Sequence, residues 1–256
     1  MNRAAFSFPF TETMYFEINR NCTLGVRPVG NSQTPVIVID DFAVSTGPLQ
    51  EYACSDVSYG PDETSLYPGL RAGLPRDYVR GVLNQVFPLL FRVYGVPQQL
   101  GLKPVNAVFS VISTPEAELE PRQCAPHFDS TRPHYLALLH YLNPGPHCDT
   151  GLFRHRETGL ERVSAESVSS YIAAREAWLE RNGPQEPSYI KGSDAQFELY
   201  DRIEYRPNRL AIYPGSLLHS GLVDPAVDID PDPRSGRLTA NIFVDFFPME
   251  GAARDV

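Results

Sequence analysis

Hydrophobic and polar positions follow different patterns before and after Pro104. Apolar residues recur mostly at helical spacing before it and form short runs bounded by proline-containing turns after it. The predicted strands cover residues 36–39, 105–112, 135–142, 209–213 and 238–247. The predicted helices cover residues 45–54, 77–94 and 164–182. Many strands without regularly interleaved helices predict a mainly β fold with flanking helices, a sandwich or jelly roll rather than a parallel α/β sheet.

The segments between these elements carry their own signals. Pro88 should kink or split the helix over 77–94, because proline lacks a backbone N–H and its ring crowds the preceding turn. Residues 56–76 are rich in Gly, Pro and Ser, which is typical of a loop. Residues 224–234 are acidic and contain prolines, so we expect an exposed loop there. The pattern over 1–34 is mixed and predicts no element.

Length, composition and charge narrow the class of protein. A chain of 256 residues is long enough to bury a large core, and its net charge of −9 argues against binding to nucleic acid or an anionic membrane. It contains no apolar run long enough to cross a membrane. Four scattered cysteines without a CxxC pair predict free thiols and a cytoplasmic location. The helix over 164–182 offers a lid or a dimer surface, so a homodimer stays open.

Two histidines and one aspartate are the strongest candidates for chemistry. His127 and Asp129 are two positions apart, so in an extended segment both side chains leave the same face while Phe128 points into packing. His219 follows the predicted strand over 209–213 and supplies a third ligand. Two imidazoles and one carboxylate on one face of a metal ion leave three positions open, as a mononuclear iron(II) oxygenase requires. The alternative is that both histidines are hydrogen-bonded structural residues.

An arginine at the start of the last predicted strand is a further candidate for binding. Arg237, Thr239 and Asn241 alternate along this strand and therefore share one face. A guanidinium with a neighbouring hydroxyl suits a buried carboxylate, because its planar fork binds both oxygens and stays charged. This predicts a slot for an anionic co-substrate beside the metal. The alternative is a surface arginine that begins a strand after a loop.

At this point the chain resembles the superfamily of 2-oxoglutarate- and iron(II)-dependent oxygenases, in particular its prolyl-4-hydroxylase-like branch with uncharacterised bacterial relatives. The matching segments, in the order of that superfamily, are VIVIDDF, PHFDS, YLALLHYLN, DTGLF, NRLAIYPGSLLHSG and GRLTANIF. The resemblance implies a double-stranded β-helix (jelly roll) within a single domain over 1–256. It places an N-terminal strand and helices in 35–100, the jelly-roll core in about 105–247 and a helical insert at 164–182.

The resemblance also implies a role for each site residue. The catalytic iron(II) ligands would be His127, Asp129 and His219, and the residues that hold the distal carboxylate of 2-oxoglutarate would be Arg237, Tyr141 and Thr239. Dioxygen would be the second co-substrate, and the reaction would hydroxylate an unactivated C–H bond of an amino acid, peptide or small metabolite. The chain departs from its relatives at Cys148-Asp149-Thr150, where they often carry Gly-Gly-Thr.

Two other functions are compatible with the metal ligands alone. A non-catalytic metal-binding jelly-roll protein or sensor would need the three ligands but neither Arg237 nor Tyr141. An iron(II) oxygenase that does not use 2-oxoglutarate would also lack the co-substrate pocket. A basic segment over 152–159 is a further hypothesis: it would line the entrance of the site, or else form a solvated turn.

Overall fold

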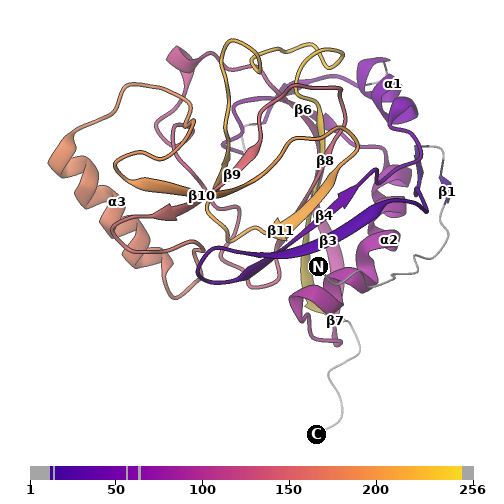
Figure 1. Ribbon diagram of the computed structural model, residues 1–256, viewed down its shortest axis with the longest axis horizontal. Helices are drawn as coiled ribbons and strands as arrows, with labels where there is room; N and C mark the ends of the chain where they lie inside the picture. Colours follow the sequence, from indigo (N-terminus) through magenta and orange to yellow (C-terminus); the bar gives the residue numbers. More distant parts are fainter. Residues whose placement is uncertain (1–11, 14, 56, 63–64, 250–256) are drawn as a thin grey trace, which may run out of the picture.

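The computed structural model describes residues 12–13, 15–55, 57–62 and 65–249. This part of the chain consists mainly of antiparallel strands flanked by helices (Figure 1). The strands are β1 Glu12–Thr13, β2 Phe16–Glu17, β3 Thr23–Val29, β4 Thr34–Asp40, β5 Gly60–Pro61, β6 Gly69–Gly73, β7 Leu100–Ile112, β8 Leu136–Tyr141, β9 Thr150–His155, β10 Phe197–Ile203, β11 Leu210–Pro214, β12 His219–Gly221 and β13 Thr239–Pro248. The helices are α1 Gly47–Ser55, α2 Arg76–Tyr94 and α3 Val168–Asn182, with a 3-10 turn at Glu116–Glu118. The mainly β class with flanking helices, expected from the sequence, is confirmed.

Two sheets form the body of the protein. The larger has the order β3-β4-β11-β8-β13-β7-β6-β5, and the smaller has the order β10-β9-β12. Side chains alternate between the faces of a strand, so Ile37, Leu138 and Ile212 pack on one face of the large sheet with α1 and α2. The opposite face, with Ala137 among its residues, packs against Leu152 of the small sheet. The site described below lies on that second face, between the two sheets.

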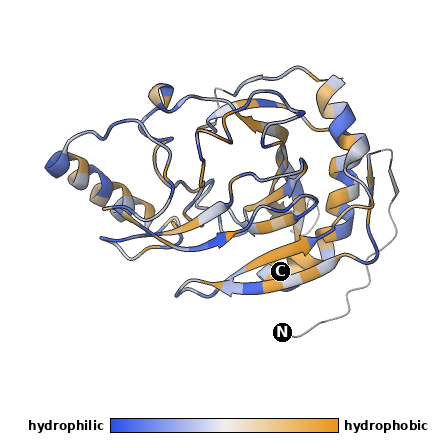
Figure 2. Ribbon diagram, turned by 45° about the horizontal axis from the view of Figure 1, so that its top comes forward, coloured by the Kyte–Doolittle hydropathy of each residue, from blue (hydrophilic) through white to orange (hydrophobic). Residues whose placement is uncertain are grey.

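The third helix lies at the end of the molecule remote from α1 and α2 (Figure 1). It packs through Tyr171 into a cluster with Phe153 and Phe197 of the small sheet. Its apolar residues Ile172 and Leu179 are exposed. Figure 2 shows hydrophilic and hydrophobic positions mixed along α3, whereas the strands of the large sheet are more hydrophobic. The helix therefore sits on the outside of the small sheet and is only lightly buried.

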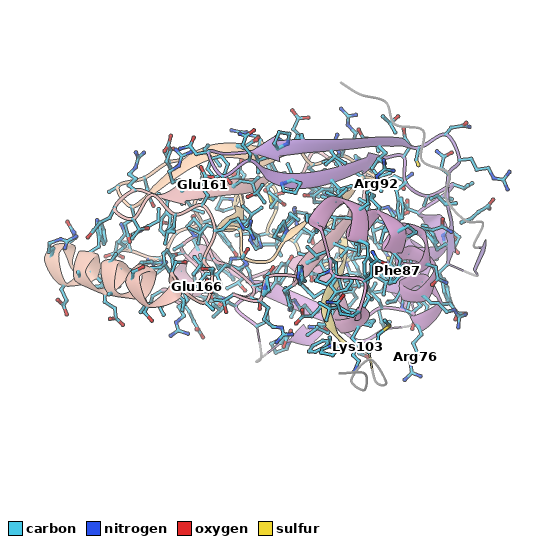
Figure 3. The ribbon with its side chains drawn as sticks, turned by 90° about the horizontal axis from the view of Figure 1, so that it is seen from below. Arg76, Phe87, Arg92, Lys103, Glu161 and Glu166 are labelled. Atoms are coloured by element: carbon cyan, nitrogen blue, oxygen red, sulfur yellow. The ribbon has the colours of Figure 1, made fainter. Side chains whose placement is uncertain are left out.

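Helix α2 runs without interruption through Pro88, so the expected split is wrong. Val86, Leu89 and Leu90 on either side of the proline are buried against the large sheet. Tertiary packing of that face outweighs the local cost of the proline. Phe87 lies on the other side of α2, packs against Phe91 and is exposed (Figure 3).

Two segments predicted as loops contain more structure than expected. Residues 56–76 include β5 and β6: β6 pairs with β7, and β5 pairs with β6 at the edge of the sheet, where glycine and proline are tolerated. The acidic segment 224–234 is irregular, but it is not fully exposed. Its Asp228 is buried and accepts hydrogen bonds from the backbone N–H groups of Cys148 (2.9 Å) and Asp224 (2.8 Å). That segment is therefore anchored to the turn before β9.

Glu161 ties the hairpin between β3 and β4 to the region after β9. Its buried carboxylate accepts hydrogen bonds from the backbone N–H groups of Asn31 (2.8 Å) and Ser32 (2.9 Å) and from Nε of Arg154 (3.0 Å). Burial raises the pKa of this carboxyl, but the hydrogen bonds outweigh burial and lower the pKa to about 2. Gly30, at φ 64°, approaches so closely that a Cβ there would lie 2.4 Å from the carboxylate. Figure 3 shows Glu161 far from α2.

Two expectations drawn from composition can be compared with the structure. All four cysteines carry free thiols, as their spacing predicted. Within the described residues, no helix is both long and apolar enough to span a bilayer.

Candidate metal centre

His127, Asp129 and His219 converge on one point, as the sequence predicted. Their ligand atoms all lie within 4.8 Å of one another. Nε2 of His127 is 3.8 Å from Oδ1 of Asp129, and Nε2 of His219 is 3.8 Å from Oδ2 of the same carboxylate. Each histidine backbone N–H donates to the other's carbonyl at 2.9 Å, which fixes the two imidazoles side by side.

Asp129 is positioned by the end of β11. Its backbone N–H donates to the carbonyl of Gly215 at 2.7 Å. A Cβ at position 215 would lie 2.6 Å from the ring of Tyr135 and 3.1 Å from Cβ of Asp129, so only glycine allows this approach. The segment around His127 is a single bridge followed by a bend, not a regular strand. The two side chains still point the same way, and Phe128 packs toward Tyr171 as predicted.

The protonation states suit metal binding. The carbonyl of Leu217 can only accept, so Nδ1 of His219 carries the proton in their 2.9 Å hydrogen bond and Nε2 presents its lone pair. Burial, with contributions from His219 and Arg71, lowers the pKa of His127 well below its ordinary value, which favours the neutral imidazole. Burial raises the pKa of Asp129, whereas His219 and Arg71 lower it.

Asp129 also shows an unsatisfied atom. Its Oδ2 is buried without a hydrogen-bond partner within the described part of the chain. Such an atom is costly unless an ion or a ligand group meets it. Nitrogen and oxygen donors separated by 3.8 Å are too far apart for mutual hydrogen bonds, but they can bind a cation placed between them. Two imidazoles and one carboxylate fit a divalent transition metal.

A cavity of about 100 Å³ extends from these ligands between the two sheets. Arg237, Thr239 and Asn241 all line it, so the predicted alternation along the last strand is correct. The Arg237 side chain is nearly buried, at 4% exposure, and its Nε donates to the carbonyl of Cys148 at 3.0 Å. Among the described residues, no carboxylate lies within ion-pairing distance of this guanidinium.

Tyr141 supports Arg237 but does not line the cavity. Its hydroxyl is hydrogen-bonded to Oγ1 of Thr150 at 2.8 Å, and its ring lies 5.3 Å from the Arg237 guanidinium carbon. Thr150 does line the cavity, so the turn Cys148-Asp149-Thr150 shapes this pocket through the Cys148 carbonyl and the Thr150 hydroxyl. A direct contact of Tyr141 with a bound co-substrate therefore remains only a prediction.

Sequence reasoning missed Arg71. It lies on β6 within the segment predicted as a loop, and it lines the cavity together with the metal ligands. Strand register explains its position: Arg71 pairs with Ser110, Ser110 with Thr239, and Thr239 with Tyr141, which forms one row across the sheet. Arg71 and its neighbour Ala72 face opposite sides of β6, and Ala72 belongs to the core beneath α2. Only the strand assignment of residues 69–73 could have revealed this.

The basic segment 152–159 does not line the cavity. Its first residues form β9, where Arg154 pairs with Glu161 at 2.5 Å and with Glu198 at 2.7 Å. His155 is buried and contacts Thr158 through Nδ1 at 2.9 Å. The hypothesis that this segment forms the entrance is therefore wrong, because none of its residues lines the cavity and its charged groups bind Glu161, Glu198, Arg181 of α3 and the Asp194 carbonyl.

Comparison with known proteins gives a family but no activity. Residues 20–244 match a family of unknown function, DUF6445. The match covers most of the 256-residue chain, including every site residue described above, and the chain belongs to this family. No curated protein matches it.

Proposed function

We propose that this member of the DUF6445 family is an iron(II)- and 2-oxoglutarate-dependent oxygenase that hydroxylates an unactivated C–H bond of an amino acid, peptide or small metabolite. One observation carries the proposal: a buried arginine without a carboxylate partner in the described chain shares a cavity with a His-Asp-His cluster. The His-Asp-His cluster and Arg237 each lack an interaction partner. Among the described residues, the cluster has a carboxylate oxygen without a hydrogen-bond partner, and Arg237 has no carboxylate within ion-pairing distance.

An unpaired buried charge favours an anionic ligand. Desolvating a cation is expensive unless an anion compensates it. A dicarboxylic keto acid meets both needs, because one end can bind a metal and the other can pair with Arg237. Iron(II) held by His127, Asp129 and His219 would, with 2-oxoglutarate and dioxygen, supply the oxidant for C–H hydroxylation.

The protein's own residues have separate tasks in this function. The hydrogen bond from His219 to Leu217 fixes the imidazole tautomer and its orientation. The contact of Arg237 with the Cys148 carbonyl aims the guanidinium. The space between the cluster and the arginine lies between the two packed sheets, which would limit the access of water to it. Asp129 favours hydroxylation over halogenation, because halide binding needs the position that this carboxylate occupies.

The strand arrangement is compatible with a double-stranded β-helix, which we propose as the finer description of the fold. Two antiparallel sheets face each other, and the site lies between them. His219 comes from the small sheet and Arg237 precedes β13 of the large sheet. In a jelly roll, strands of both sheets likewise contribute to an interior site.

Binding of 2-oxoglutarate under anaerobic conditions tests the proposal. The protein is loaded with iron(II), titrated with 2-oxoglutarate and followed by the visible charge-transfer absorption of the chelate. We expect saturable binding, and succinate formation when oxygen is admitted. Asp129→Ala and His219→Ala should abolish both signals, whereas His134→Ala, outside the cavity lining, should retain them.

The same titration distinguishes the proposed function from the two alternative functions. A non-catalytic metal-binding protein, or an oxygenase that does not use 2-oxoglutarate, would bind iron(II) without developing the absorption band. Iron binding without the band would therefore overturn the proposed function.

A further inference from the structure

A second cavity, which we call the outer chamber, adjoins the candidate metal centre; the cavity lined by Arg237 is the inner one. The outer chamber has a volume of about 300 Å³ and includes His127 and Asp129 in its wall, but not Arg237. Its remaining walls combine aromatic surface with a few polar groups, among them Phe243, Tyr135, Asn106 and Arg71. A chamber of this size that combines aromatic walls with charged and polar groups can hold a small polar molecule. It opens directly onto two of the three metal ligands.

Arg71 is the fixed charge of this chamber. Its side chain is 11% exposed, its Nη1 pairs with Asp62 at 2.8 Å, and its guanidinium lies 4.8 Å from the ring centre of Tyr67. These contacts hold one end of the guanidinium in place. Its Nε is buried and has no hydrogen-bond partner among the residues that the structure describes. One edge of the fork is therefore anchored, while a donor on another edge remains unsatisfied.

We propose that Arg71 binds the carboxylate of the primary substrate, so that the substrate is a small carboxylic acid. This inference rests on the proposed function. Arg71 lines both cavities, whereas Arg237 lines only the inner one. The inner arginine thus pairs with the co-substrate, and the outer arginine holds the substrate with a C–H bond facing the metal. In a chain of net charge −9, two arginines gathered at one cavity make a local site for acids.

The aromatic walls select what lies beyond the carboxylate. Tyr135 and Phe243 are in contact, with ring centres 6.2 Å apart, and both line the outer chamber. They offer apolar surface to a hydrocarbon chain, which is where an unactivated C–H bond is found. A free amino acid or another small acid with an aliphatic chain fits this combination better than an extended peptide does.

A matched panel tests the inference with saturating 2-oxoglutarate. The probes are the twenty L-amino acids, C4–C8 straight-chain carboxylic acids, and the carboxamide of each, with succinate release as the readout. At least one acid should stimulate release while its carboxamide requires a much higher concentration. Arg71→Met should raise the KM for that acid roughly 10- to 100-fold, because a charge-assisted contact is lost. Arg71→Lys should recover part of the loss.

Two variants distinguish recognition of the substrate carboxylate by Arg71 from a structural role of its ion pair with Asp62. Asp62→Asn removes the ion pair but keeps the arginine, so the preference for acid over amide should persist. Arg181→Met changes an exposed arginine of α3 and should have no effect. If Asp62→Asn lost the preference as fully as Arg71→Met does, Arg71 would act only through the ion pair and the inference would be overturned.

The remaining outcomes distinguish this inference from the proposed function. Wild-type protein that fails to bind 2-oxoglutarate contradicts the function itself. Normal 2-oxoglutarate binding with no acid preferred over its amide contradicts only the role of Arg71. Loss of 2-oxoglutarate binding in Arg71→Met would assign this residue to the co-substrate instead, which also overturns the inference.

Discussion

Replacing Arg237 with methionine should weaken 2-oxoglutarate binding without destabilising the metal-free protein. Methionine approximates the length of the arginine stem but removes the charge. A bidentate, charge-assisted contact contributes about 3 kcal/mol, so the Kd should rise about 100-fold. The metal-free variant loses one hydrogen bond to Cys148, yet it also loses a buried, unpaired charge. Its free energy of unfolding should therefore stay within about 1 kcal/mol of the wild type, or rise.

Arg209 provides a matched control. It is also buried, at 7% exposure, but its Nε pairs with Oδ1 of Asp40 at 2.6 Å. Arg209→Met breaks an existing ion pair and should lower the free energy of unfolding by about 2 kcal/mol or more. It lies outside the cavity lining, so 2-oxoglutarate affinity should not change in molecules that remain folded.

Urea denaturation of the metal-free proteins and the anaerobic titration together give both quantities. The two arginines should show opposite patterns: binding lost with stability kept at Arg237, and stability lost with binding kept at Arg209. Our reasoning would be refuted if Arg237→Met were as destabilising as Arg209→Met while it bound 2-oxoglutarate with wild-type affinity. Arg237 would then be a structural residue.

Three further predictions concern the surroundings of the site. Gly215→Ala should weaken iron(II) binding roughly tenfold in a metal titration, because the new methyl would press on a neighbouring ring and on a metal ligand. Tyr141→Phe should change 2-oxoglutarate affinity only a few-fold, because its hydroxyl already bonds Thr150; a loss as large as that of Arg237→Met would indicate direct contact. The Glu161 carboxyl has a pKa of about 2 against an ordinary 4.5, which corresponds to roughly 3 kcal/mol of stability. This contribution is complete above pH 4.5 and is lost as pH falls towards 2, so Glu161→Gln should be destabilising in urea at pH 7 and nearly neutral near pH 2.

Strong local patterns predicted the elements that carry the site. The β-branched run at 36–39 is part of β4, and the apolar runs at 135–142 and 209–213 correspond to β8 and β11. These strands lie at the centre of the large sheet, where burial on both faces demands apolar residues in sequence. Strands β3 and β6, at an edge of the sheet and next to one, were missed, because they contain glycine, arginine or proline and owe their conformation to pairing with neighbouring strands.

The convergence of the three candidate metal ligands could be predicted because residue spacing specifies much of their geometry. His127 and Asp129 need only an extended backbone to face the same way, and His219 needs only to follow a core strand. The structure adds the distances between their ligand atoms. The distinction between Tyr141 and Thr150 could not be predicted, because it depends on which hydroxyl reaches the cavity. A sequence gives the order of such residues along the strands, but it does not show which side chains reach the cavity.

Buried polar residues on one face of the large sheet indicate why the candidate site lies on that face. Ser110, Thr239 and Asn241 are buried on a sheet face whose other residues form an apolar core. Asn241 donates to the Ser110 hydroxyl at 2.8 Å, but its Oδ1 has no partner in the described chain. With the charges of Arg71 and Arg237 on the same face, folding alone leaves this row poorly compensated. A bound acid would supply the missing partners, and this row would then serve as a recognition surface rather than as a part of the core.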